Sequence, residues 1–171
     1  EYNIQNRKRL MNYLQIQIEK GDPPLQPTVD GTKIRKTVIK DFILKVLDYL
    51  GKDKWELSVL FCNDSFIQEL NSAYRGKDEP TDVLTFAQVD SDIPFPAKNN
   101  RYYAGDIAIS LETLSKNSKA FDVSPDEELK RLLIHGILHL DGMDHEDNEP
   151  EREMLVLQEK ILQDFKGVQL L

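Results

Sequence analysis

The sequence predicts an α+β fold in which one small sheet of about four strands packs against about five helices. Two observations lead to this class. Four short runs have the alternating or β-rich composition of strands, and five other stretches carry the apolar spacing or end signals of helices. The chain has 171 residues and shows no internal repeat or linker. We therefore expect residues 1–171 to form a single domain.

The predicted strands are residues 13–19, 55–62, 82–89 and 107–111. The first alternates polar and apolar side chains, as a half-buried strand does. The third is rich in β-branched and aromatic side chains. Residues 21–31 and 90–104 contain prolines together with glycines or asparagines, so they are expected to be loops.

The predicted helices are recognised from apolar periodicity and from end signals. Between residues 32 and 50 apolar side chains recur at every fourth position, and Gly51 follows. Ser124 and Pro125 supply a cap and a first-turn proline for a helix that ends before Gly142. The other three are a short helix that Asn63 or Ser65 caps, a helix after residue 111, and a last helix from near Pro150 to before Gly167.

Composition limits the classes of protein that this chain can belong to. The net charge of −8 argues against broad coating of nucleic acid, although contact through a few basic groups remains open. No apolar run is long enough to cross a membrane, and no signal peptide is evident, so we expect no membrane partner. The single cysteine, Cys62, follows an apolar run and is expected to be buried and inert. These features favour a cytoplasmic protein. Residues 1–10 are expected to be a loose arm or a non-native extension, with Met11 near the native start.

The three histidines of the chain are His135, His139 and His145. Residues four apart lie on one face of a helix, so the first two point the same way near the C-terminal end of the capped helix. Gly142 allows the chain to turn back and bring the third toward them. Three imidazoles favour zinc and leave a position for water, which predicts a catalytic metal site of a metallohydrolase. The alternative is three histidines with separate hydrogen-bond partners.

The histidine spacing is that of the long zinc-protease motif with one change. In that motif a glutamate that activates water follows the first histidine, but here Gly136 occupies its place. Peptide hydrolysis by that mechanism would therefore lack its base.

A second group of polar residues lies on the predicted loop before the third strand. Arg75 and Lys77 stand where functional groups are common, and an arginine head group fits phosphate. The alternative is a surface charge paired with Asp78 or Glu79. A stripe of Lys33, Lys36 and Lys40 could add to a basic groove, but such a stripe is more often a solvated face.

Three blocks of sequence, in this order, resemble the YbeY family of bacterial metal-dependent endoribonucleases, which act in ribosomal RNA maturation and ribosome quality control. They are Tyr74-Arg75-Gly76-Lys77 with Pro80-Thr81-Asp82-Val83-Leu84-Thr85-Phe86, then Gly105-Asp106-Ile107-Ala108-Ile109-Ser110, then His135-Gly136 through His139 to Asp144-His145. The chain departs from the family pattern at Ala87, where proline is usual, and beyond Gly167.

The resemblance implies that His135, His139 and His145 bind one Zn²⁺ per chain and that Arg75 is important for activity. We assign Arg75 to catalysis and Lys77 to substrate binding. The implied substrate is single-stranded RNA, with ribosomal RNA and the small ribosomal subunit as partners of a monomeric chain.

Two other function classes remain as alternatives. One is a metzincin-like zinc peptidase that lacks the usual glutamate, and the other is a non-catalytic ribosome-assembly protein with a structural zinc. The general base is not identified by the sequence. Asp82 and Asp144 are candidates for orienting a histidine, with a turn anchor and a helix-end cap as the alternatives.

Overall fold

The computed structural model describes residues 12–21, 24–91, 100–145, 149 and 152–171. The main sheet has the strand order β1-β4-β6-β5. Its strands are β1 (Tyr13–Ile18), β4 (Trp55–Cys62), β6 (Tyr102–Ser110) and β5 (Val83–Ala87). The first three run parallel, and β5 pairs antiparallel to β6 as an edge strand. The prediction for residues 1–10 falls outside the described part of the chain.

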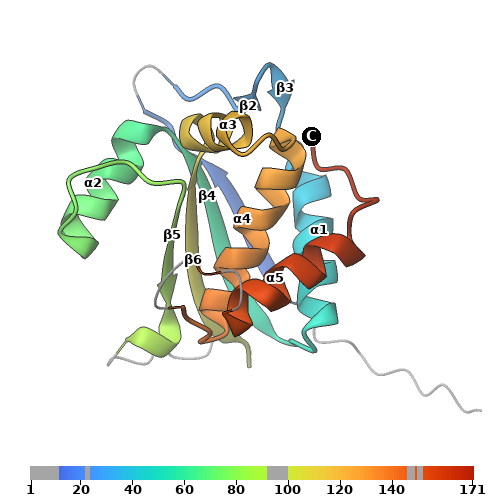
Figure 1. Cartoon of the computed structure of the whole chain (residues 1–171). Helices are drawn as coiled ribbons and strands as arrows, with labels where there is room; N and C mark the ends of the chain where they lie inside the picture. The colour runs from blue at the N-terminus through green and yellow to red at the C-terminus, as the bar shows by residue number, and fades with distance from the viewer. Residues whose placement is uncertain (1–11, 22–23, 92–99, 146–148, 150–151) are drawn as a thin grey trace, which may run out of the picture.

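Five α-helices surround this sheet in the described part of the chain (Figure 1). They are α1 (Lys36–Tyr49), α2 (Asp64–Arg75), α3 (Leu111–Ala120), α4 (Pro125–Leu140) and α5 (Glu153–Asp164). The predicted α+β class, with its one sheet and its helices, is thereby confirmed. None of the described helices is long and apolar enough to cross a membrane.

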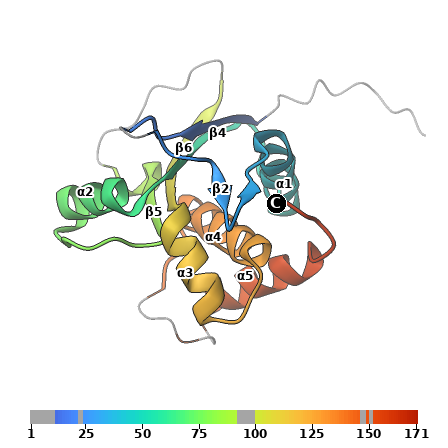
Figure 2. The same cartoon turned by 90° about the horizontal axis from the view of Figure 1, so that it is seen from above.

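The helices divide between the two faces of the sheet. Neighbouring residues of a strand point to opposite faces, and Phe61 belongs to the large core with α1, α4 and α5, whereas Cys62 packs with Ile67 of α2. Figure 2 shows α2 apart from the other large helices. Cys62 is buried as expected, and burial raises the pKa of its thiol to about 12.

The predicted helix start at residue 32 is wrong, because a small hairpin precedes α1. Its strands are β2 (Thr28–Val29) and β3 (Thr32–Lys33). Asp30 and Gly31 both have positive φ, 47° and 81°, as the central residues of a tight hairpin turn do. Helix α3 holds this turn, because Ser115 and Lys119 of α3 donate hydrogen bonds to the Asp30 carboxylate.

The start of β6 and the end of β5 also differ from the predicted strand boundaries. Strand β6 begins at Tyr102, and a bulge in its pairing with β4 lies at Ala104, between Tyr103 and Gly105. Gly105 has φ 137°, and a Cβ atom there would lie 2.1 Å from the Phe86 carbonyl oxygen, so only glycine fits this close approach. Strand β5 ends at Ala87 and a short 3₁₀ turn, η1 (Gln88–Asp90), follows.

The capping signals of α4 are confirmed. The Ser124 hydroxyl accepts a hydrogen bond from the Glu127 amide, and Pro125 is the first helical residue. Gly142, with φ 85°, lies just beyond the last turn. Helix α4 thus has fixed ends, and its last turn carries His139.

Candidate metal centre

The imidazoles of His135, His139 and His145 converge at the C-terminal end of α4. One ligand atom from each lies within 4.8 Å of the other two. The Nε2 atoms of His135 and His139 are 3.0 Å apart. The His145 ring centroid lies 5.2 Å and 5.3 Å from those of His135 and His139. The structure therefore brings together the three residues that the sequence predicted.

The partner of His139 fixes the direction of its lone pair. Its Nδ1 lies 3.0 Å from the Met143 carbonyl oxygen, which can only accept a hydrogen bond. Nδ1 therefore carries the proton, and Nε2 presents a lone pair toward His135. A metal ion among the three ring nitrogens could accept this lone pair, so this donor set fits a metal ion such as zinc.

The surroundings of His135 and His139 keep these two imidazoles neutral. Burial lowers the pKa of His135. Burial, followed by the neighbouring histidines, lowers the pKa of His139 to about 4. Neutral imidazole is the form that binds metals, so the site is prepared for an ion at neutral pH.

The histidines open into a cavity of about 320 Å³ beside β5. Arg75, at the end of α2, reaches the same cavity, and its Nη2 donates to the Thr85 carbonyl oxygen at 2.9 Å. This contact uses one of the five N–H donors of the guanidinium. The described residues that line the cavity are Arg75, Val83, Leu84, Thr85, Asp90, His135, His139, Gly142, Met143, Asp144 and His145.

Lys77 and the lysine stripe do not line this cavity. Lys77 is exposed, just after Gly76, which ends α2 in the left-handed conformation. Lys33 lies in β3 and Lys36 begins α1, and both elements start at the end of the molecule opposite the last turn of α4 (Figure 1). The stripe is therefore a solvated face and does not form a groove beside the histidines.

Asp82 has the simpler of its two predicted roles, a turn anchor, whereas Asp144 is not the predicted helix-end cap, because the C-cap of α4 is Asp141. Asp82 accepts hydrogen bonds from the Val83 amide and from Asn117. Asp144 accepts from the His145 amide, and its Oδ1 is 3.8 Å from Nδ1 of His139, too far for a hydrogen bond. Both carboxylates accept a hydrogen bond from the main-chain amide of the following residue, whereas the Nδ1 atoms of His135 and His139 have Gln158 and Met143 as their partners.

The residue that does contact His135 was missed by the sequence analysis. Oε1 of Gln158, from α5, lies 2.8 Å from Nδ1 of His135. Gln158 is only 5% exposed and stands among Met154, Ile161 and Leu162 on the buried face of α5. A polar side chain within an apolar helical stripe was the available signal.

Comparisons with known proteins point to one family. The family model described as endoribonuclease YbeY matches residues 26–166. The endoribonuclease YbeY of Treponema denticola is 52% identical over 132 residues, which cover 77% of this chain and 84% of that protein. The Borrelia hermsii protein of the same name is 47% identical over 129 residues, 75% of this chain and 84% of its own length.

A solved structure has a similar fold. The solution structure of TM1509 from Thermotoga maritima matches with a TM-score of 0.56 and 29% sequence identity, and the match covers 90% of this chain and 89% of that one. The match to the family model extends over most of the chain and includes Arg75 and all three histidines. The chain belongs to the YbeY family of endoribonucleases.

Proposed function

We propose that this chain is a zinc-dependent endoribonuclease that cuts single-stranded RNA during ribosomal RNA maturation. Family membership supports the endoribonuclease activity. The observation that carries the proposal is that three imidazoles and the Arg75 guanidinium line one cavity.

His135, His139 and His145 would hold one zinc ion per chain through ring nitrogens. When bound, such an ion supplies Lewis-acid chemistry, which polarises a phosphoryl oxygen or activates water near neutral pH. The protein prepares for this by keeping the His139 imidazole neutral and by aiming its Nε2 at the cluster.

Arg75 would act as the catalytic residue that holds the scissile phosphate. Its bond to the Thr85 carbonyl oxygen fixes the head group at the cavity wall, and its remaining donors suit phosphate oxygens. A fixed positive charge there stabilises the negative charge that grows in the transition state. Lys77, exposed just beyond the helix end, would bind a neighbouring phosphate of the substrate.

Tyr74 supports the preference for single strands. The residue is 67% exposed, and its ring packs edge-on against Phe86, with ring centroids 5.1 Å apart. An exposed aromatic ring beside a phosphate-binding arginine offers a surface on which an unpaired base can stack. Bases in a duplex are already stacked and paired, so they could not use this surface.

The wider setting forms part of the same proposal. The partners would be ribosomal RNA and the small ribosomal subunit, and the protein would act as a single-domain monomer in the cytoplasm. These statements rest on what the family resemblance implies. The net charge of −8 fits an enzyme that meets RNA through a few local cations.

The test is cleavage of one labelled RNA in single-stranded form and in duplex with its complement, with chelator and then with zinc restored. We expect cleavage of the single strand that chelator abolishes and zinc restores, with little cleavage of the duplex. Equal cleavage of both forms would refute the single-strand specificity, and cleavage that persists in chelator would refute the metal dependence.

A further inference from the structure

We propose that Gln158 is a positioning residue of the metal centre, which holds His135 in the tautomer whose Nε2 lone pair faces the metal position. We also propose that Glu159, held by Arg131, sets the direction of the Gln158 amide. The inference rests on the proposed function only in taking His135 as a metal ligand.

Both ends of the Gln158 amide have a hydrogen-bond partner. Oε1 lies 2.8 Å from Nδ1 of His135, and Nε2 donates to Oε1 of Glu159 at 3.0 Å. Because Gln158 is 5% exposed, an amide end without a partner would be costly, so these contacts hold the side chain in place.

The ionised Glu159 carboxylate decides which end of the Gln158 amide faces His135. Glu159 is ionised, since hydrogen bonds from Arg131 and Gln158 outweigh the opposing effect of burial and lower its pKa. An ionised carboxylate only accepts hydrogen bonds, so the NH₂ end of Gln158 must face Glu159. Its carbonyl oxygen must then face His135, so Nδ1 of His135 is the donor. A neutral imidazole has one N–H, and the lone pair is therefore on Nε2, which faces His139.

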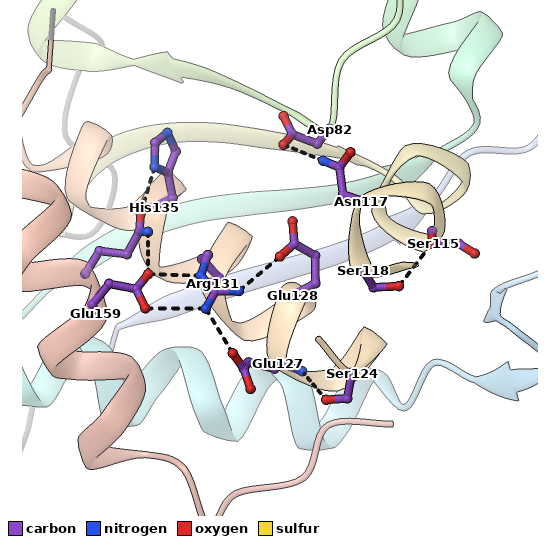
Figure 3. Close-up of polar contacts among 11 residues, drawn as sticks. Asp82, Ser115, Asn117, Ser118, Ser124, Glu127, Glu128, Arg131, His135 and Glu159 are labelled. Carbon is purple, nitrogen blue, oxygen red and sulfur yellow. Dashed lines mark hydrogen bonds and ion pairs between the residues drawn. The ribbon is translucent and has the colours of Figure 1, made fainter. Parts of the chain in front are cut away.

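Hydrogen bonds from Arg131 hold the Glu159 carboxylate in place. Its Nε donates to Oε1 of Glu159 at 2.9 Å, and its Nη atoms donate to Glu127 at 2.9 Å and to Glu128 at 3.1 Å (Figure 3). Glu128 is 2% exposed, so one anchor of the guanidinium lies in the core. Three carboxylates hold the planar Arg131 guanidinium in one orientation. The guanidinium in turn holds Glu159 where its carboxylate accepts a hydrogen bond from the Gln158 amide.

The two ligands on α4 are thus oriented in different ways. His139 uses a main-chain carbonyl, that of Met143, which no substitution removes. His135 depends on a side chain from α5, 23 positions along the sequence. Gln158 is therefore where the orientation of a ligand can be changed without touching the ligand itself. Loss of such a partner typically costs 10- to 100-fold in metal affinity.

The test compares Gln158→Met and Gln158→Glu with the control Gln163→Met, an exposed glutamine of the same helix. Methionine keeps the volume but removes the acceptor. Glutamate keeps an acceptor for His135 but places a second negative charge beside Glu159. Three quantities are measured: zinc affinity by competition with a chromophoric chelator, the His135 tautomer in metal-free protein by ¹⁵N NMR, and the free energy of unfolding in urea.

We expect Gln158→Met to lower zinc affinity by about 10- to 100-fold and to populate both His135 tautomers. Gln158→Glu should keep the Nδ1–H tautomer and stay within about threefold of wild-type zinc affinity, even where it unfolds more easily. Gln163→Met should match wild type in tautomer and zinc affinity. A residue that served only packing would give the opposite order for the two Gln158 variants, because methionine suits a buried site better than a carboxylate does.

The proposal is overturned if Gln158→Met keeps the wild-type zinc affinity and tautomer, or if Gln158→Glu loses as much affinity as Gln158→Met. A wild-type chain that binds no zinc would also overturn it. None of these measurements uses RNA. A chain that binds zinc with the expected order of variants but cuts no RNA would contradict the proposed function and leave the role of Gln158 intact.

Discussion

A Cβ atom added to Gly136 would lie 2.8 Å from Cδ1 and 2.9 Å from Cγ2 of Ile107. Gly136 is buried in α4, and Ile107 is fully buried in β6. The position that carries the catalytic glutamate in long-motif zinc peptidases is here directed at the sheet, and its lack of a side chain lets α4 approach β6. The peptidase alternative therefore lacks both the glutamate and the space for one.

Gly136→Ala is expected to lower the free energy of unfolding by about 1–3 kcal/mol, because the added methyl group overpacks the contact with Ile107. Urea unfolding measures this. Gly167→Ala is the matched control, since its Cβ atom would have no neighbour within 4 Å, and it should change stability by less than about 0.5 kcal/mol.

Gly136→Glu should gain no peptidase activity. A stable Gly136→Glu variant that cleaves peptides would contradict this view of the helix–sheet contact.

Zinc should stabilise the folded chain through the histidine cluster. At free zinc about 1,000 times its Kd, binding to the folded state alone adds about 4 kcal/mol to the free energy of unfolding. The free energy of unfolding of the wild type in urea should be higher with zinc than with chelator, and the difference should grow with zinc concentration. His139→Ala should show little of this difference, because it removes one of the clustered ring nitrogens. An equal zinc effect in that variant would place the metal elsewhere.

Lys77 should affect RNA affinity through charge and not the chemical step. Lys77→Ala is expected to raise KM for single-stranded RNA with little change in kcat, and to reduce the slope of log affinity against log salt by about 0.7. Lys33 is an exposed lysine of β3, which lies away from the last turn of α4 (Figure 1), and Lys33→Ala is the matched control that should leave both quantities unchanged. Equal effects of the two substitutions would mean that Lys77 contributes only general charge.

Tyr74→Ala should weaken binding of single-stranded RNA by roughly 5- to 150-fold, the range expected for loss of one base stacked on an aromatic ring. Binding can be measured in chelator, so that the RNA stays intact. Tyr74→Phe keeps the ring and should bind nearly as wild type does. If phenylalanine weakens binding as much as alanine, the hydroxyl group matters and stacking is not the cause.

Local signals predicted much of this fold correctly. Ser124 and Pro125 mark the start of α4 within the sequence itself, and the spacing of His135 and His139 places them on one face of that helix. The return of His145 followed from Gly142, which does adopt positive φ. Each of these inferences depends on residues that are near neighbours in the chain.

The features that sequence reasoning missed depend on long-range contacts. The β2–β3 hairpin is held from outside by α3, with Ser115 bonded to Asp30 across 85 positions. The partner of His135 comes from α5, and nothing near His135 in the sequence identifies Gln158. Asp82 and Asp144 were candidates because they are acidic and close to the motifs, but their carboxylates serve nearby main-chain amides.

The most direct test of the central claim measures bound zinc and single-stranded RNA cleavage together in the wild type, His139→Ala and Arg75→Ala. The account predicts one zinc per wild-type chain, loss of both zinc and cleavage in His139→Ala, and full zinc with cleavage reduced by about 100-fold in Arg75→Ala. Wild-type rates of cleavage in both variants would contradict it, because neither the histidine cluster nor the arginine across the cavity would then take part in the reaction.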